Sequence, residues 1–498
     1  MTLDVDTSRR PGPDGPIVRS AIRFRFRGRD VEVSAFAPRT TLLDWLRIEQ
    51  GAVGAKEGCG EGDCGACTVM LVRRNGGDVS YAPVNACILL LGQIDGAELV
   101  TIEDLATGDA LHPVQEAMVA THGSQCGFCT PGIVMSLAAL HEAAPEPPAR
   151  AAIRDQLAGN LCRCTGYKPI VEAAVQAGVR GAQPSRWTGL ADAPRRDLLV
   201  GDDAQFFAAP ADMDSLAAFY LAHPDATLLA GGTDVGLWIT KGLKDLRKII
   251  WLGHVAGLAD IADGAASLRL GAGVDLARAM PHLGAIHPDL GEVMRRFGSA
   301  QVRASGTVGG NLANGSPIGD LAPCLIALGA TLELRRGAQT RTLPLEDFFL
   351  DYRKQDRQAG EFVVAVTIPK LGARDRFCAF KVSKRLDEDI SAVLAAFKFE
   401  VVDQRIGAAR MAYGGMAGVP ARARSAEGFI IGARLDDEKT WRGGLTALGL
   451  DFTPLSDQRA SAAYRSLVAR NLLLKALMEM RGAPLQDTRI APPREAVS

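Results

Sequence analysis

Residues 57–67 read E-G-C-G-E-G-D-C-G-A-C, and with one later cysteine they form the pattern C-x4-C-x2-C-x19-C, made by Cys59, Cys64, Cys67 and Cys87. This first quartet has the spacing of a plant-type 2Fe-2S cluster, in which three ligands share one loop and the fourth returns from a distant strand. Glycines between the cysteines leave backbone amides free to turn toward cluster sulfides. Structural zinc, which usually takes two C-x2-C pairs, and disulfides are the alternatives.

A second quartet lies in Q-C-G-F-C-T-P-G and G-N-L-C-R-C-T-G-Y, with the pattern C-x2-C-x32-C-x1-C formed by Cys126, Cys129, Cys162 and Cys164. Four thiolates hold one cluster, so eight indicate two. The C-x-C pair is less diagnostic, and zinc stays open here. Pro131 and Pro169 predict helices that begin after these cysteines, so we expect two positive helix ends to face one anionic centre. His112 and His122 lie nearby but lack the two-histidine, two-cysteine set of a Rieske site.

The composition is that of ordinary globular domains. The 498 residues are 47% hydrophobic and 23% charged, and this length suggests three or four domains. Lys+Arg 56 and Asp+Glu 57 leave a net charge of −1, so no global field recruits nucleic acid or anionic lipid. The N-terminal stretch has no apolar signal core, and no apolar run is long enough to span a membrane. We expect a cytoplasmic, reducing location, where disulfides are rare.

Periodicity divides the chain into successive units. Ile22, Phe24 and Phe26 alternate with arginines and predict a half-buried β-hairpin, while Thr41 and Asp44 predict a capped helix. A helical pattern with four helices follows, then a segment without a sustained period. The units expected from these patterns are a disordered arm at 1–17, a ferredoxin-like unit at 18–95, a helical unit at 96–180, a linker at 181–205, and two further units at 206–375 and 376–485.

The C-terminal half carries two glycine-rich stretches. A short apolar strand at 227–230 runs into G-G-T-D, a turn whose amides suit a pyrophosphate. The G-x-G-x-x-G fingerprint and the Walker loop are absent, so a Rossmann or P-loop fold has no support. The stretch 297–320 gathers glycines densely enough for close approach to a large polar ligand, with an irregular surface loop as the alternative. Strands are expected at 331–334, 362–368, 377–382 and 406–413, and a helical tail at 461–481.

Six segments are diagnostic together: E-G-C-G-E-G-D-C-G-A-C-T-V, H-G-S-Q-C-G-F-C-T-P-G, G-N-L-C-R-C-T-G-Y, L-L-A-G-G-T-D-V, V-G-G-N-L-A-N-G-S-P-I-G-D and A-Y-G-G-M-A. Over nearly the whole chain they resemble the small iron-sulfur/FAD subunit of bacterial xanthine dehydrogenases, in the xanthine oxidase group of molybdenum hydroxylases. The resemblance implies a multidomain α+β fold: a β-grasp ferredoxin-like 2Fe-2S domain, a four-helix 2Fe-2S domain, an α/β FAD-binding domain of the vanillyl-alcohol-oxidase/CO-dehydrogenase-flavoprotein type, and a C-terminal α+β flavoprotein domain.

The resemblance also implies residue roles. The first quartet would hold the cluster nearer the flavin, and the second the cluster nearer the molybdenum. The FAD pyrophosphate would be wrapped by Leu228, Leu229, Ala230, Gly231, Gly232, Thr233, Asp234 and Val235. Phe297 would lie against the isoalloxazine, Thr307 and Asn311 at the phosphates or ribityl chain, and the pocket would be completed by Asp320, Val363 and Lys381. An acidic segment then either borders the flavin face where NAD docks or is a solvated loop; it consists of Asp387, Glu388 and Asp389.

The molybdopterin-binding part of the family is not in this sequence, so the resemblance implies a separate large subunit in an (αβ)2 heterotetramer. Hypoxanthine or xanthine would be oxidised to urate there, and this chain would pass the electrons through two 2Fe-2S clusters and FAD to NAD. The same electron-transfer role would also suit a molybdenum hydroxylase that acts on an aldehyde, a nicotinate-like heterocycle or an aromatic thioester. A protein of a different class, an interaction scaffold held together by zinc, is the other alternative. Cys324 and Cys378 are expected to be buried apolar thiols, and we expect no catalytic triad.

Overall fold

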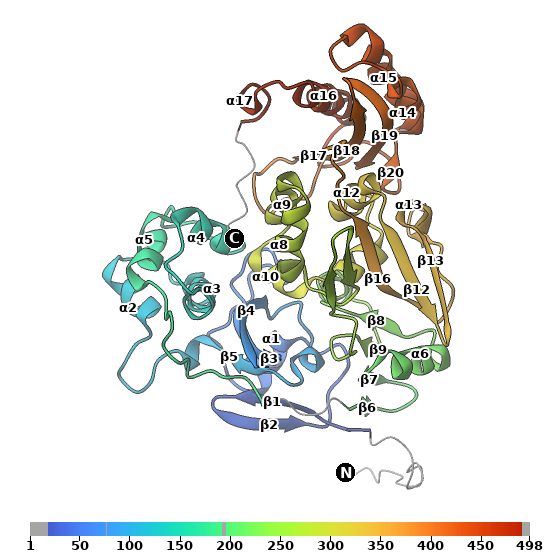
Figure 1. Cartoon of the computed structure of the whole chain (residues 1–498). Helices are drawn as coiled ribbons and strands as arrows, with labels where there is room; N and C mark the ends of the chain where they lie inside the picture. Colours follow the sequence, from blue (N-terminus) through green and yellow to red (C-terminus); the bar gives the residue numbers. More distant parts are fainter. Residues whose placement is uncertain (1–17, 76, 192–195, 491–498) are drawn as a thin grey trace.

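The computed structural model describes residues 18–75, 77–191 and 196–490 (Figure 1). The arm expected at 1–17 lies outside these residues. The described chain contains five β-sheets with helices between and around them, which confirms the multidomain α+β class. Among its helices, none combines the length and the apolar character needed to cross a bilayer.

The first cysteine-bearing unit consists of β1 Ile22–Phe26, β2 Arg29–Val33, α1 Leu42–Asp44, η1 Trp45–Glu49, β3 Thr68–Asn75, β4 Asp78–Asn85, η2 Leu91–Ile94, β5 Glu98–Val100 and η3 Ile102–Asp104. Its sheet has the order β2-β1-β5-β3-β4. β1 and β5 run parallel and the other neighbours antiparallel, as in a β-grasp fold. Phe24 and Phe26 pack edge-on against Trp45, and the Thr41 hydroxyl accepts the Asp44 N–H as the predicted cap.

The second cysteine-bearing unit has four helices, α2 Pro113–Ala120, α3 Thr130–Ala143, α4 Arg150–Leu157 and α5 Lys168–Ala177. α3 and α5 begin one residue before Pro131 and Pro169, the prolines that predict them, because proline is tolerated in a first helical turn, where its missing N–H has no intrahelical partner. Met70 and Val72 of β3 share one apolar core with Ile133 and Leu137 of α3. The helices therefore pack on one face of the ferredoxin-like sheet and lie together at its side (Figure 1).

The described residues of the linker expected at 181–205 make specific contacts with other units. Trp187 is buried in the core of the helical unit, and its carbonyl accepts a hydrogen bond from the Tyr81 hydroxyl at 3.2 Å. Two backbone N–H groups just after it donate to Glu98. Strand β6 (Leu198–Gly201) then pairs with β7 (Phe206–Ala209). Contacts distant in sequence therefore order the described residues of the linker expected at 181–205.

The third unit contains three further sheets, one of them the short pair β14-β15. Of the other two, the smaller has the order β6-β7-β9-β8, with β7, β9 and β8 parallel, and the larger is antiparallel with the order β10-β11-β16-β12-β13. The strands predicted at 227–230, 331–334 and 362–368 are confirmed to within two residues. The elements are α6 Met213–Ala222, β8 Thr227–Leu229, α7 Val235–Thr240, β9 Lys248–Trp251, β10 Ile261–Asp263, β11 Ser267–Gly271, α8 Leu276–Ile286, α9 Pro288–Arg295, α10 Ala300–Ser305, α11 Val308–Asn314, α12 Leu321–Leu328, β12 Thr331–Arg336, β13 Gln339–Pro344, α13 Leu345–Phe348, β14 Phe349–Asp351, β15 Lys354–Gln355 and β16 Glu361–Pro369.

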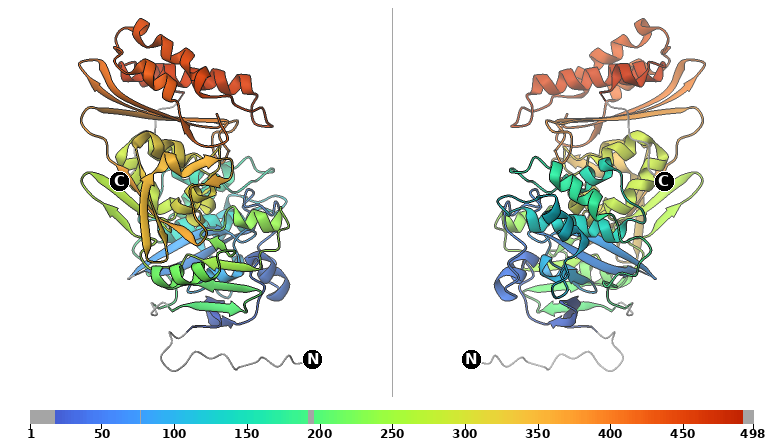
Figure 2. Two further views of the ribbon diagram at one scale, coloured as in Figure 1. Left: turned by 90° about the vertical axis from the view of Figure 1, so that its right-hand side faces the viewer. Right: turned by 90° about the vertical axis from the view of Figure 1, so that its left-hand side faces the viewer.

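The fourth unit is an antiparallel sheet, β17-β18-β19-β20, with helices on the face that points away from the rest of the molecule (Figure 2). Two predicted strands and the predicted helical tail are confirmed as β17, β19 and α16, whereas β18, α14 and α15 were not predicted. The elements are β17 Asp375–Val382, β18 Val393–Val402, β19 Arg405–Gly414, β20 Ala421–Arg422, α14 Arg424–Ile430, α15 Glu438–Asp451, α16 Ala462–Met480 and α17 Leu485–Thr488.

Candidate cofactor sites

The sulfur atoms of the first quartet converge. Cys59 accepts hydrogen bonds from the thiols of Cys64 and Cys87, and Cys67 accepts one from Cys87. Three backbone N–H groups, at positions 61, 63 and 64, also point at Cys59 Sγ, each at 3.4 Å. These bonds, led by the one from Cys64, hold the pKa of the Cys59 thiol far below its ordinary value. Four thiols linked by contacts between them, with backbone amides directed at Cys59 Sγ, fit the donor set of a 2Fe-2S cluster.

The second quartet lies nearer the surface. Cys126 and Cys164 are exposed, while two members of the first quartet are buried. Cys126 is hydrogen-bonded to Cys164, and Cys129 to Cys162. α3 begins directly after Cys129, as expected. The Cys162 N–H donates to the hydroxyl of Tyr167, whose left-handed backbone precedes α5. The exposed pair makes this quartet the one that an external electron donor can approach.

A hydrogen bond joins the two cysteine loops. The N–H of Leu161 donates to the carbonyl of Cys64 at 3.0 Å, and Leu161 directly precedes Cys162. A Cβ on Gly132, in the first turn of α3, would lie 2.1 Å from the carbonyl oxygen of Gly65. Glycine at this position therefore lets the two loops touch, and the path between the quartets crosses one hydrogen bond and a few covalent bonds.

At the end of α3 opposite the second quartet, His112, His141 and Glu142 are buried with their possible ligand atoms within 4.8 Å of one another. The hydrogen bonds do not suit a metal. His112 Nδ1 accepts the Val114 N–H, so Nε2 carries the proton and faces Glu142 at 3.6 Å, whereas a metal needs an unprotonated nitrogen. Glu142 also pairs with Arg180 at 2.8 Å, and that charge repels a cation. This group is a structural support for α2 and α3.

The turn after β8 has the free donors that a pyrophosphate needs. The backbone N–H groups of Gly231, Gly232, Thr233 and Asp234 make no hydrogen bond to any residue that the structure describes. Gly232 has a φ of 83°, which favours glycine. A Cβ on Gly231 would lie 1.8 Å from the Ser305 carbonyl oxygen, so the turn packs directly on the second glycine stretch. Consecutive free amides form an anion site, which fits the pyrophosphate role expected for this turn.

The stretch 297–320 is not an irregular loop. It contains α10 and α11, which meet at Gly306 and Thr307. The Thr307 hydroxyl oxygen accepts the Gly310 N–H at 3.0 Å, so this oxygen caps α11. Asn311 lies half-buried on α11, and its side chain makes no hydrogen bond within the described part of the chain. Asn311 is therefore free to meet a ligand, and the expected contact of Thr307 with FAD stays a prediction.

Other expected pocket residues come together from distant parts of the sequence. Lys381 Nζ donates to Asp320 at 2.7 Å and to the carbonyl of Arg296, next to Phe297, at 3.0 Å. The side chains of Lys381 and Asp320 are only 2% and 5% exposed. Val363 is buried in the apolar core on which Phe297 packs. The Lys381–Asp320 pair thus holds the turn that presents Phe297.

The acidic segment after β17 forms an ion pair at Asp387. Asp387 binds Arg295 at 3.0 Å, and the same guanidinium binds Asp155 of the helical unit at 2.9 Å. Asp389 accepts the Arg385 N–H at 2.9 Å and so closes its own turn. Asp387 is thus both ion-paired and 38% exposed, so the solvated-loop alternative and the expected role of the segment at an NAD face both stay predictions.

Glu388→Gln is expected to stabilise the fold at alkaline pH. One Glu388 oxygen is buried without a hydrogen-bond partner, and burial, followed by the charge of Asp63, raises its pKa from 4.5 to about 8. Neutral Glu388 therefore supports the fold fully below about pH 4.5, and this support is lost as the pH rises to about 8. The variant should match the wild type near pH 5 and exceed it by about 2 kcal/mol near pH 8.5.

Thermal unfolding at both pH values measures this difference. Exposed Glu146 provides the matched control, because Glu146→Gln should follow the wild type at both pH values. A gain of equal size at acidic and alkaline pH would contradict the role of Glu388 ionisation.

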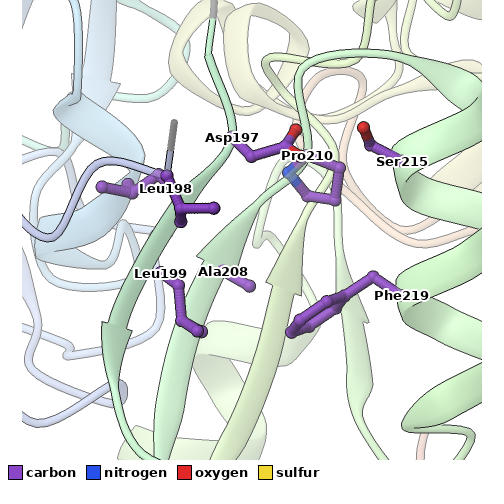
Figure 3. Close-up of a pocket in the computed structure, with 8 residues that line it drawn as sticks. Asp197, Leu198, Leu199, Ala208, Pro210, Ser215 and Phe219 are labelled. Carbon is purple, nitrogen blue, oxygen red and sulfur yellow. The ribbon is translucent and has the colours of Figure 1, made fainter. Parts of the chain in front are cut away.

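Two hollows adjoin these elements. The larger, about 370 Å³, is polar and brings together residues next to both cysteine loops: Arg47, Val53, Lys56, Glu57 and Phe128. The smaller, about 90 Å³, lies between β6, β7 and α6 (Figure 3) and is lined by Val18, Asp197, Leu198, Leu199, Ala208, Pro210, Ser215 and Phe219. It is too small for a dinucleotide and is lined by neither glycine stretch, so it is a packing feature.

Two buried side chains that shape these sites were missed by sequence reasoning. Arg303 donates to three carbonyls of the turn at Phe297, at 2.9 to 3.0 Å, and burial lowers its pKa to about 10. Gln301 donates to Ser136 and Asn160 of the helical unit at 3.0 and 2.9 Å and to Thr68 of the ferredoxin-like unit at 3.3 Å, so its amide joins three units. One sequence signal could have indicated them. In S-A-Q-V-R-A-S the two long polar residues, Gln301 and Arg303, are surrounded by small residues.

Family models match four successive parts of the chain. They are the 2Fe-2S iron-sulfur cluster binding domain at 24–91, the [2Fe-2S] binding domain at 101–175, the FAD binding domain in molybdopterin dehydrogenase at 203–371, and the CO dehydrogenase flavoprotein C-terminal domain at 378–480. Fold, sites and matches together define an iron-sulfur flavoprotein with two 2Fe-2S domains, which overturns the zinc alternative. The chain belongs to the molybdenum hydroxylase family and is of its small iron-sulfur/FAD subunit type.

The chain is similar to several known proteins. The chain is 29% identical to a xanthine dehydrogenase of Emericella nidulans over 96% of its length, 31% to the xanthine dehydrogenase/oxidase of Mus musculus over 79%, and 28% to the nicotinate hydroxylase hnxS of Emericella nidulans over 91%. It spans 40%, 34% and 40% of these relatives. Among solved structures, quinoline 2-oxidoreductase from Pseudomonas putida 86 matches with a TM-score of 0.50 and 27% identity, over 55% of this chain and 96% of that one. The carbon monoxide dehydrogenase of Hydrogenophaga pseudoflava has the same fold, with a TM-score of 0.52 and 23% identity over 55% of this chain and 97% of that one.

Proposed function

We propose that this chain is the electron-transfer subunit of a xanthine dehydrogenase. The eight quartet cysteines hold two 2Fe-2S clusters, and the two glycine stretches with Phe297, Asp320, Val363 and Lys381 hold FAD. A molybdopterin-bearing partner supplies the electrons, and NAD receives them. When bound, the clusters carry electrons singly and the flavin combines them for two-electron transfer to NAD.

The order of contacts between the sites carries this proposal. The hydrogen bond from Leu161 to Cys64, at 3.0 Å, connects the second quartet to the first. Gln93 donates to the carbonyl of Ala230 at 3.0 Å and ties the ferredoxin-like unit to the first glycine turn. A Cβ on Gly236 would lie 2.4 Å from the carbonyl of Ile88, the residue after Cys87. The sites therefore form one continuous series of contacts, from the second quartet through the first quartet to the turn at Gly231 to Asp234, which we call the flavin turn.

The relatives support this choice of partner and substrate. Several relatives are named xanthine dehydrogenase, at 27 to 31% identity, and the exposed Cys126 and Cys164 give a donor access to the second quartet. A nicotinate-like heterocycle is the second candidate, because the nicotinate hydroxylase relative matches almost as well, at 28%.

The decisive experiment is purification of the chain with its molybdopterin-bearing partner, followed by assay of NAD reduction. Xanthine-dependent reduction supports the proposal, and reduction with nicotinate but not xanthine favours the second candidate. The chain alone, loaded with clusters and FAD, should be bleached by NADH. A loaded chain that NADH does not reduce would contradict NAD as the acceptor.

Cys64→Ser is expected to remove one cluster and leave the other. Cys64 belongs to the first quartet and contacts the second loop through its carbonyl. Iron should fall from about four to about two atoms per chain while flavin is retained, and one of two electron paramagnetic resonance signals of the reduced protein should vanish. Cys324→Ala is the control, because Cys324 is fully buried outside both quartets, as predicted. The same iron content in both variants would contradict the ligand assignment.

A further inference from the structure

A lysine of the flavin unit reaches the loop of the first quartet. Lys241 directly follows α7, and its ammonium donates a hydrogen bond to the carbonyl of Cys59. The same nitrogen lies 3.8 Å from a carboxylate oxygen of Glu61 and would lie 3.8 Å from a Cβ on Gly60. Its partners all belong to the turn between the first two cysteines. α7 therefore carries the flavin turn at one end and a cation against the quartet at the other.

The sign of the effect follows from electrostatics. Reduction of a 2Fe-2S cluster adds a negative charge, and a nearby cation stabilises that charge. The ammonium of Lys241 is hydrogen-bonded to the backbone of Cys59 itself, whereas the carboxylate of Glu61, 3.8 Å from that ammonium, has the opposite charge and opposes its effect. Both side chains are about half exposed, 48% and 43%, so water and salt screen part of the interaction.

We infer that Lys241 raises the reduction potential of the cluster held by the first quartet, so that this cluster accepts electrons more readily from the second. The inference rests on the proposed function, which places a 2Fe-2S cluster on the four cysteines. Lys241 thus does more than join the flavin unit to the ferredoxin-like unit, because its charge also adjusts the reduction potential of the cluster.

Redox titration of the whole loaded chain, followed by electron paramagnetic resonance, tests this role. The signal absent from Cys64→Ser identifies the first-quartet cluster. We compare the variants at the midpoint potential of the wild type. There, Lys241→Met should lower the ratio of reduced to oxidised first-quartet cluster about fivefold, which corresponds to a midpoint potential lower by about 40 mV. Lys241→Arg keeps the charge and should stay near the wild type. The second-quartet cluster serves as the reference within each sample.

Glu61→Gln is the matched control of opposite sign. The substitution keeps the Glu61 N–H that donates to Cys59 Sγ at 3.4 Å and removes only the opposing charge, so the midpoint should rise. Added salt should shrink both differences. An unchanged midpoint in Lys241→Met with full iron and flavin overturns the inference, as does an equal shift in the Met and Arg variants. A wild-type chain without clusters would instead reject the proposed function.

Discussion

Gly231→Ala is expected to abolish FAD binding while both 2Fe-2S domains keep their iron. The added Cβ would lie 1.8 Å from the carbonyl oxygen of Ser305, 2.5 Å from its carbon and 2.9 Å from the Cα of Gly306. These are backbone atoms, so relief requires the two glycine stretches to separate. That separation breaks the surface of four free N–H groups that we propose as the pyrophosphate site. We expect at least a roughly hundredfold loss of affinity, about 2.7 kcal/mol.

Flavin content after purification and titration of the flavin-free protein with FAD measure this loss. Gly428→Ala is the control, because Gly428 lies inside α14 and nothing lies within 4 Å of an added Cβ there. That change should stabilise the helix by up to about 1 kcal/mol and leave FAD binding unchanged. Normal flavin affinity in Gly231→Ala would show that the turn does not form part of the FAD site.

Asp320→Asn is expected to destabilise the folded protein by about 3 to 5 kcal/mol, because it leaves the buried ammonium of Lys381 without its counter-charge. Asp320 accepts from Lys381 at 2.7 Å and also from the Ser391 hydroxyl. Lys381 in turn holds the Arg296 carbonyl beside Phe297. The flavin pocket should therefore loosen together with the fold, and denaturant unfolding with measurement of flavin content detects both effects.

An exposed pair of similar length provides the comparison. Asp225 binds Lys248 at 2.9 Å with its side chain 62% exposed, and exposed ion pairs contribute little, so Asp225→Asn should hardly change stability. The double variant Asp320→Leu with Lys381→Met should recover much of the loss, since an apolar pair has no charge to desolvate. Equal losses from the two single aspartate variants would mean that burial does not set the strength of the Asp320–Lys381 pair.

Local signals predicted a large part of this fold. Alternation in Ile22, Phe24 and Phe26 predicted β1, and prolines predicted the starts of α3 and α5, because these patterns depend on the residues of one element. β18 was missed although it lies at the centre of its sheet. Its sequence V-L-A-A-F-K-F-E-V-V is buried on both faces over most of its length, so the period-two alternation that marks a half-buried strand is absent. α10 and α11 were missed because glycines in close packing look like loop residues.

Some features of the candidate sites could likewise be predicted from the sequence, and others could not. Cysteine spacing predicted both quartets, and the turn from Gly231 to Asp234 was found from its strand and glycines. Sequence could not predict that Lys381 pairs with Asp320, that Asp387 pairs with Arg295, or that Arg303 supports the turn at Phe297. These contacts join side chains from different elements, and their partners depend on how whole units pack.

The sequence alone determined the chemistry: eight cysteines in two spacings, two glycine stretches, and a family whose members carry 2Fe-2S and FAD domains. Ligand spacing within a loop and glycine within a turn are local requirements, so they are visible in the order of residues. Only the tertiary structure decided how the sites connect, through the bond from Leu161 to Cys64, the contact of Gln93 with the flavin turn, and Lys241 against Cys59. Those contacts depend on the burial of apolar faces between units, and no local pattern encodes which faces meet.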